Sequence, residues 1–153
     1  MLTETTTTLD TPATIERLNR HLADALLLAA EAKAWHWSVY GPTFPELHAL
    51  FEAQAESARR GADELAERVV QLGGVPAAFP QEWLARGALA VPEAGSVPAP
   101  REMLRHFAAN LDRIIASVRE DIPRVDPTTA DILTDWLRET EKNRWMVTAT
   151  ARE

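Results

Sequence analysis

The sequence has four histidines and no cysteine, so any metal site must use imidazole and carboxylate ligands. Two pairs of such residues stand out: His48 with Glu52, and Asp63 with Glu67, each four residues apart. Residues four apart lie one above the other on a helix, so each pair is a potential chelate. Nitrogen and oxygen ligands suit Fe(II), Mn(II) or Zn(II) and argue against copper(I) and iron–sulfur chemistry.

The two pairs share one side of the helix that would carry them. With His48 at zero and about 100° per residue, Glu52 lies at about 40°, Asp63 at about 60° and Glu67 at about 100°. However, His48 and Asp63 are fifteen residues apart, which is roughly 22 Å along a helix axis. Metal ligands bind at roughly 2 Å. One chain therefore cannot place both pairs on one ion.

Two chains can do so if this helix packs antiparallel against its copy about a two-fold axis. The numbers of facing residues then add up to one total, and 48 with 67 has the same total as 52 with 63. The axis passes between positions 57 and 58. We expect nearby small residues to let the two backbones approach closely, with the arginines at 59 and 60 pointing away. These small residues are Ala53, Ala55, Ser57, Ala58, Gly61 and Ala62.

A turn at Pro42 adds a further ligand. His36 and His48 are each six residues from this proline, so antiparallel helices on its two sides can place them face to face. In the ordinary di-iron bundle the metal is held by Glu-x-x-His pairs in the core. No such pair occurs in this sequence, so a metal site must be built differently.

One alternative leaves the metal out. Asp63 and Glu67 would then be solvated and paired with neighbouring arginines at 59, 60 or 68, while the histidines only pack. Another alternative is a helical dimer that uses zinc for structure alone.

Hydrophobic residues spaced three and four apart predict the helices that position these side chains. We expect a helix from Thr11 and Pro12 to residue 39, and a second from a Thr43–Glu46 capping box to the stop at residues 73 and 74. A third follows Pro100, and a fourth starts at residues 126 and 127 with a stripe that includes Trp136 and Trp145.

The second and third helices are joined by a long connection. Residues 75–100 contain five of the ten prolines, with a short helical stretch expected at 81–86. No strand pattern is visible. The predicted fold class is all-α, a ferritin-like four-helix bundle with a long crossover between the second and third helices. We expect residues 1–10 to form a flexible tail and residues 11–150 one domain.

Three segments strongly resemble the Dps family of ferritin-like proteins. They are residues 33–52 (KAWHWSVYGPTFPELHALFE), 63–74 (DELAERVVQLGG) and 129–134 (TADILT). The resemblance implies a dodecamer built from two-fold dimers. It also implies oxidation of Fe(II), typically by hydrogen peroxide, at sites between two subunits, with storage of ferric mineral in the hollow shell. DNA would thereby be protected from oxidative damage.

The resemblance also assigns roles to individual residues. It implies a ferroxidase with His36, His48, Asp63 and Glu67 as catalytic ligands and Glu52 as a further metal ligand; Asp63 and Glu67 come from the partner subunit. Zn or Mn can substitute for iron at such a site.

Other residues of this chain match or depart from the family pattern. Lys33 matches a family lysine that would neutralise a carboxylate of the empty site. Ser38 and Glu52 replace residues that are commonly asparagine and aspartate in the family. Trp37 is interpreted as a packing residue, with the alternative that it donates an electron during peroxide reduction. The family also suggests that Asp121, Asp126 and Asp131 line entry channels; the alternatives are that Asp126 is a helix N-cap and Asp121 a solvated charge. Growth of a mineral would need an acidic interior surface, for which the acidic residues at 56 and 64 are candidates.

Charge and composition argue against a second function, a structural protein that coats the nucleoid. The chain of 153 residues carries 16 basic and 23 acidic residues, a net charge of −7. Its first fourteen residues contain no lysine or arginine, so we expect no direct DNA binding. No signal peptide is visible, and the longest apolar run, residues 25–30, is too short to span a membrane. We therefore expect a cytoplasmic protein.

Overall fold

The computed structural model describes residues 10–152. The helices are α1 (Thr11–Ser38), α2 (Phe44–Gln71), α3 (Pro80–Arg86), α4 (Pro100–Asp121), the short 3₁₀ helix η1 (Ile122–Arg124) and α5 (Pro127–Ala151). No strand occurs among the described residues. The predicted all-α fold class is confirmed. Of the predicted tail, residues 1–9 lie outside the described part of the chain.

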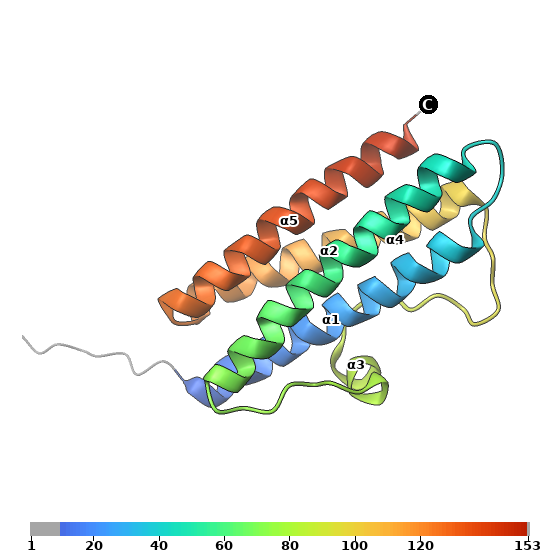
Figure 1. Ribbon diagram of the computed structural model, residues 1–153. Helices are drawn as coiled ribbons and strands as arrows, with labels where there is room; N and C mark the ends of the chain where they lie inside the picture. The colour runs from blue at the N-terminus through green and yellow to red at the C-terminus, as the bar shows by residue number, and fades with distance from the viewer. Residues whose placement is uncertain (1–9, 153) are drawn as a thin grey trace, which may run out of the picture.

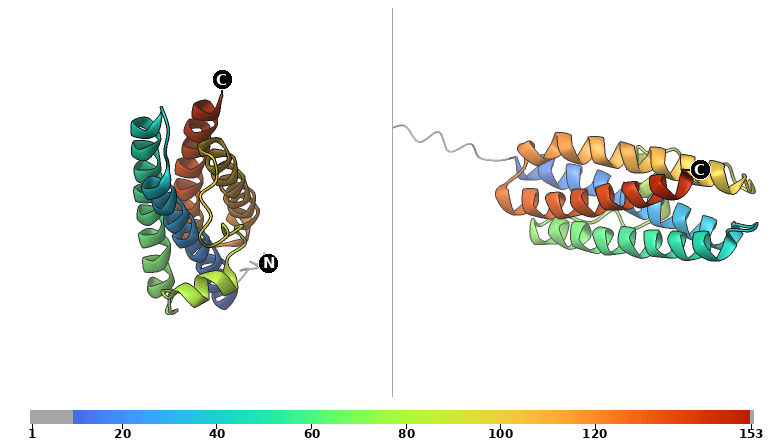
Figure 2. Two further views of the ribbon diagram at one scale, coloured as in Figure 1. Left: turned by 90° about the vertical axis from the view of Figure 1, so that its right-hand side faces the viewer. Right: turned by 90° about the horizontal axis from the view of Figure 1, so that it is seen from above.

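The four long helices form two hairpins that pack side by side (Figure 1). The connection after α2 runs along the outside of α1, includes α3, and returns the chain to the far end of the bundle, so that α4 runs parallel to α2. Figure 2 shows the α1–α2 turn and the α4–α5 turn at opposite ends of the bundle. In residues 10–152 no helix combines the length and apolar character that crossing a membrane requires.

The helix ends agree with the sequence in part. The side chain of Asp10, and not Thr11, caps α1, accepting a hydrogen bond from the N–H of Ala13 at 3.2 Å. Thr43 precedes α2 but makes no side-chain capping bond, so the predicted capping box is wrong. The predicted start of α5 is confirmed, because Asp126 accepts a hydrogen bond from the Thr129 N–H at 3.0 Å.

The double glycine ends α2 as predicted. Gly73 adopts a φ of +86°, a conformation that residues with a Cβ rarely take. This bend lets the N–H of Gly73 reach the carbonyl of Val70, and the N–H of Gly74 that of Val69, both at 2.9 Å. Two carbonyls at the end of the helix thereby gain partners.

The small residues of α2 pack inside their own bundle. Ala55, Ala58 and Ala62 are at most 4% exposed, and Ser57 accepts a hydrogen bond from Asn143 of α5 at 2.7 Å. Gly61 faces the ring of Trp136, which a Cβ at this position would overlap. The expectation that these residues line a contact between chains is therefore wrong; of the set, only Ala53 is exposed.

Two predicted packing residues prove to be on the surface. Trp145 is 66% exposed and Trp37 is 71% exposed. Trp136, in contrast, is buried as expected, although its Nε1 has no hydrogen-bond partner among the described residues.

A candidate metal centre

Two imidazoles form the base of the candidate site, near the α1–α2 turn. His36 lies close to the end of α1 and His48 in the second turn of α2. Their rings stack with centroids 3.7 Å apart and planes 17° from parallel, and Phe44 stacks on the outer face of His48. The prediction that the two histidines face each other is confirmed.

Each imidazole is fixed by the backbone of the other residue. The Nδ1 of His36 lies 2.8 Å from the carbonyl oxygen of His48, and the Nδ1 of His48 lies 2.7 Å from the carbonyl oxygen of His36. A carbonyl oxygen only accepts, so both Nδ1 atoms must carry the proton and donate. In the neutral rings the lone pair is therefore on Nε2, where it can bind a metal.

Glu52 adds a carboxylate to this pair. Its Oε2 lies 3.3 Å from the Nε2 of His36, close to the separation of two ligands that bind one ion at roughly 2.1 Å each. The same oxygen accepts a hydrogen bond from the Nζ of Lys33. This bond, with the charges of Lys33, His36 and Arg59, outweighs the opposing effect of desolvation and lowers the pKa of Glu52. The carboxylate is thus held in its charged form.

Asp63 and Glu67 lie further along α2 and are exposed. Within residues 10–152 neither carboxylate has a hydrogen-bond or ion-pair partner. Arg68, one possible partner, instead donates to Asp126 and Thr129, both at 3.0 Å. That part of the metal-free alternative is therefore wrong.

The chain by itself places three of the five predicted ligands near one another, with His36 in contact with both His48 and Glu52. It brings together His36, His48 and Glu52 and leaves the other two carboxylates apart. No three histidine or acidic side chains among the described residues are grouped so that they could hold a metal within one chain.

Sequence reasoning missed a second acid–imidazole cluster, which lies inside the bundle. The buried carboxylate of Glu31 accepts hydrogen bonds from Trp35 at 3.1 Å and Asn110 at 2.7 Å. Its Oε1 also lies 2.6 Å from the Nδ1 of His106. The only signal in the sequence was an acidic residue between apolar neighbours on α1, at positions 29 and 32.

Asp121 belongs to a third cluster and does not face solvent. It is 3% exposed and contacts His21 at 2.8 Å, Arg17 at 3.2 Å and Arg20 at 3.6 Å. Burial by itself would raise the pKa of Asp121, but the hydrogen bond and charge of His21 and the charges of both arginines bring it below its ordinary value. The expectation that Asp121 lines a channel is wrong. Asp126 caps α5 and pairs with Arg68, whereas Asp131 is exposed.

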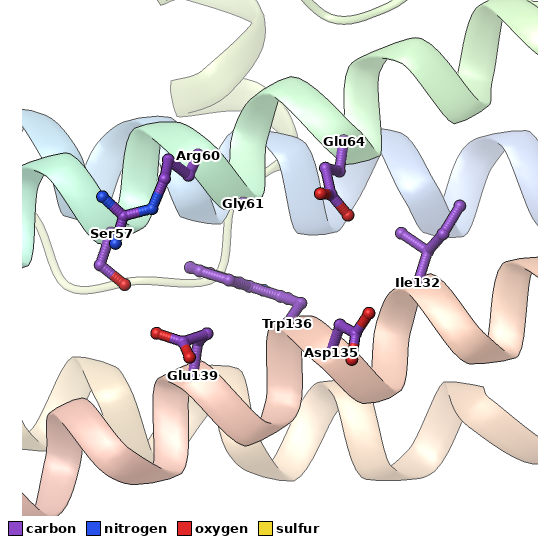
Figure 3. A pocket seen from close by; sticks show the side chains of 8 residues that line it. All are labelled: Ser57, Arg60, Gly61, Glu64, Ile132, Asp135, Trp136 and Glu139. Atoms are coloured by element: carbon purple, nitrogen blue, oxygen red, sulfur yellow. The ribbon is translucent and has the colours of Figure 1, made fainter.

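Further acidic residues gather around a cavity of about 150 Å³ between α2 and α5 (Figure 3). Glu64 of α2 faces Asp135 of α5 at one end of the cavity, Arg60 and Glu139 lie toward the other end, and Trp136 lies between the helices. Three carboxylates and one guanidinium leave this cavity with an excess of negative charge, which attracts cations.

Comparison with known proteins defines the class first. The family model described as "Ferritin-like domain" matches residues 15–153. The DNA protection during starvation protein of Halobacterium salinarum is 37% identical over 131 residues, covering 83% of this chain and 71% of that protein.

Solved structures agree with this class. Dps from Thermosynechococcus elongatus has a TM-score of 0.87 and 31% identity, covering 93% of this chain and 92% of that one. An archaeal Dps homologue from Halobacterium salinarum has a TM-score of 0.90 and 33% identity, covering 94% and 81%. The chain belongs to the Dps family of ferritin-like proteins.

Proposed function

We propose that this protein oxidises Fe(II) at sites shared by two copies of the chain and stores the ferric product inside a hollow oligomer. The observation that carries the proposal is the incomplete ligand set around His36 and His48. Both Nε2 lone pairs are available, one faces the carboxylate of Glu52, and this carboxylate is paired with the displaceable ammonium of Lys33. Such a site attracts a metal but does not complete its coordination.

The remaining ligands come from the partner in this proposal. Antiparallel packing of two α2 helices sets His48 opposite Glu67 and Glu52 opposite Asp63 of the second copy. Each copy then contributes its histidine end to one site and its acidic end to the other. The exposure of Asp63 and Glu67, and their lack of partners among residues 10–152, leaves both carboxylates available for this role.

The chemistry follows from the donor set. Carboxylates stabilise Fe(III) more than Fe(II), so binding at the site favours loss of an electron. Two Fe(II) ions give up one electron each, and one hydrogen peroxide takes both electrons with two protons to form two waters. Paired transfer releases no hydroxyl radical, which would protect DNA without contact. Zn(II) or Mn(II), which favour the same ligands, would compete with iron.

The assembly is also part of the proposal. We expect twelve subunits, built from two-fold dimers, around a cavity that collects the hydrolysed ferric ion. Duplex DNA should show no retardation in gels at moderate salt, because the first fourteen residues have no basic side chain.

Mixing two inactive variants tests the proposal. One variant carries His36→Ala and His48→Ala, and the other carries Asp63→Asn and Glu67→Gln. Each alone should lose peroxide-dependent Fe(II) oxidation, because every site lacks one half of its ligands. Co-expressed in equal amounts, the two should regain about a quarter of the wild-type sites, since random pairing joins intact halves at that frequency.

The matched control is co-expression of each variant with a second copy of itself, which should stay inactive. If the mixed oligomer is also inactive although mass measurements show both chains in it, the sites are not shared and the proposal fails. Oxidation by both separate variants at the wild-type rate would exclude these residues as ligands.

A further inference from the structure

A third pair of side chains lies on the same face of α2 as the ligands. Glu56 and Arg59 fall at about 80° and 20° on the wheel that places His48 at zero, inside the range of about 0° to 100° covered by the four ligands on α2. We call this face, with residues 48, 52, 56, 59, 63 and 67, the α2 stripe. Glu56 and Arg59 are both exposed, and this placement replaces the expectations that Arg59 points away from the axis and that Glu56 faces the interior.

We infer that Glu56 of each chain pairs with Arg59 of the partner across the two-fold axis, and that these two reciprocal ion pairs set the register in which the iron ligands meet. The inference rests on the proposed function, because it uses the same antiparallel packing. The partner surface is a second copy of this chain.

The numbering supports this pairing. Residues 56 and 59 have the same total as 48 and 67, and as 52 and 63, so one two-fold axis relates all three pairs. The two residues lie on either side of the axis, roughly 4.5 Å apart along the helix. The ion pairs would therefore lie at the centre of the contact, with one metal site toward each end.

The surroundings of the two side chains also support it. Within the described residues neither Glu56 nor Arg59 makes a hydrogen bond or ion pair. Four of the six small residues near the axis, Ala55, Ser57, Ala58 and Ala62, are buried in their own bundle. Charged side chains are thus what α2 presents at the centre.

Charge also disfavours a shifted contact. If the two helices slid by one turn so that Glu52 faced Glu67, then Glu56 would face Asp63 and Arg59 would face Arg60. All three contacts would be between like charges, which is costly at an interface. Sliding one turn the other way would set Glu52 opposite Arg59, but it would leave Glu56 opposite Ala55 and Glu67 opposite Phe44, so two carboxylates of each chain would lose their partners.

Charge reversal on the full-length protein tests the inference. Glu56→Arg and Arg59→Glu are made separately and together, and association is measured by sedimentation velocity over a dilution series at low and moderate salt. Each single reversal puts like charges together twice per dimer, so we expect association weaker by about tenfold or more at low salt. The double reversal restores opposite charges and should restore association. Glu64→Arg, on α2 but off the stripe, is the matched control and should associate as wild type.

Two results would overturn the inference: single variants that associate like the wild type, or a double variant that associates no better than the singles. Circular dichroism confirms that each variant is folded. Fe(II) oxidation in the same samples separates this inference from the proposed function. If charge reversal does not change association in a protein that oxidises Fe(II), only the inferred ion pairs are excluded. If the double reversal restores association but the protein does not oxidise Fe(II), only the proposed function is excluded.

Discussion

Two glutamates near α1 each meet an imidazole, but their surroundings differ. Glu31 is buried between α1 and α4, and two fixed donors and an imidazole surround its carboxylate. Glu52, on the surface of α2, has His36 and the flexible side chain of Lys33 as its ion-pair partners among residues 10–152. The first carboxylate has its hydrogen bonds completed by its own chain. The second keeps acceptor capacity that a metal ion can use.

The two arrangements serve different purposes. Asn110, which donates to Glu31, also bonds to both backbone groups of Ala90 in the connection after α3. The interior cluster thereby ties α1, α4 and the crossover together. A buried polar network is stabilising only when every member has a partner, whereas a binding site requires a partner that can be exchanged. Residue types alone therefore do not define a metal site. A metal site also requires a carboxylate whose acceptor capacity is not already used by hydrogen bonds within its own chain.

Glu31→Ala should have the largest effect on stability. It leaves the buried donors of Trp35 and Asn110 without an acceptor, and we expect the free energy of unfolding to fall by about 3 kcal/mol or more. Glu31→Gln, which keeps one acceptor, should cost less. Urea unfolding of both variants measures the loss. Wild-type stability of Glu31→Ala would show that the interior cluster is not structural.

Asp121→Asn should reveal a second interior cluster through its pH dependence. The pKa of Asp121 lies below its ordinary value of 3.8, so its charged form stabilises the fold above that pH. This stabilisation is lost as the pH falls through the lowered pKa. The variant should therefore be less stable by about 2 kcal/mol at neutral pH, and the difference should shrink below about pH 4. A stability difference between wild type and Asp121→Asn that increased as the pH fell would contradict this assignment.

Glu52→Ala should separate function from stability. Fe(II) oxidation should fall by about tenfold or more because the site loses a ligand, while the free energy of unfolding changes by less than about 0.5 kcal/mol, as for most surface positions. Stopped-flow absorbance and urea unfolding give the two numbers. A loss of stability as large as that of Glu31→Ala would remove the distinction between the two glutamates.

Lys33→Met should have the smallest effect of the four variants, and it should strengthen Fe(II) binding where Glu52→Ala weakens the site. The side chains of Lys33 and Glu52 are 32% and 34% exposed, so their ion pair contributes at most about 1 kcal/mol. Removing the competing ammonium should strengthen Fe(II) binding by up to about fivefold in an anaerobic titration. Lys142→Met, at the chain's only other lysine, is the control and should bind as wild type. Unchanged affinity in Lys33→Met would reject a role for this lysine.

Much of the fold and half of the site were predictable because the relevant contacts are local. The helix ends at Gly73 and Asp126 depend on neighbouring residues, and the meeting of His36 with His48 follows from equal distances to Pro42. The clusters of Glu31 and Asp121 were not predictable, because their partners lie 75 and 100 residues away. No local pattern announces such a contact.

The misassigned small residues had a signal in the sequence. On the wheel that places His48 at zero, Ala58 and Gly61 fall at about 280° and 220°, on the far side of α2 from the ligands. Their distance along the axis suggested a contact between chains, but their direction excluded it. Distance and direction must both be read before a residue is assigned to a surface.

The backbone anchoring of the two imidazoles limits how this protein can be redesigned or can diverge. Both acceptors are main-chain oxygens. A substitution at position 36 therefore leaves the acceptor of His48 in place, and a substitution at position 48 leaves the acceptor of His36 in place. The orientation of each imidazole ring is therefore insensitive to substitution of the other histidine. In the proposed metal site, a change in metal preference that keeps both imidazoles would therefore arise among the carboxylates.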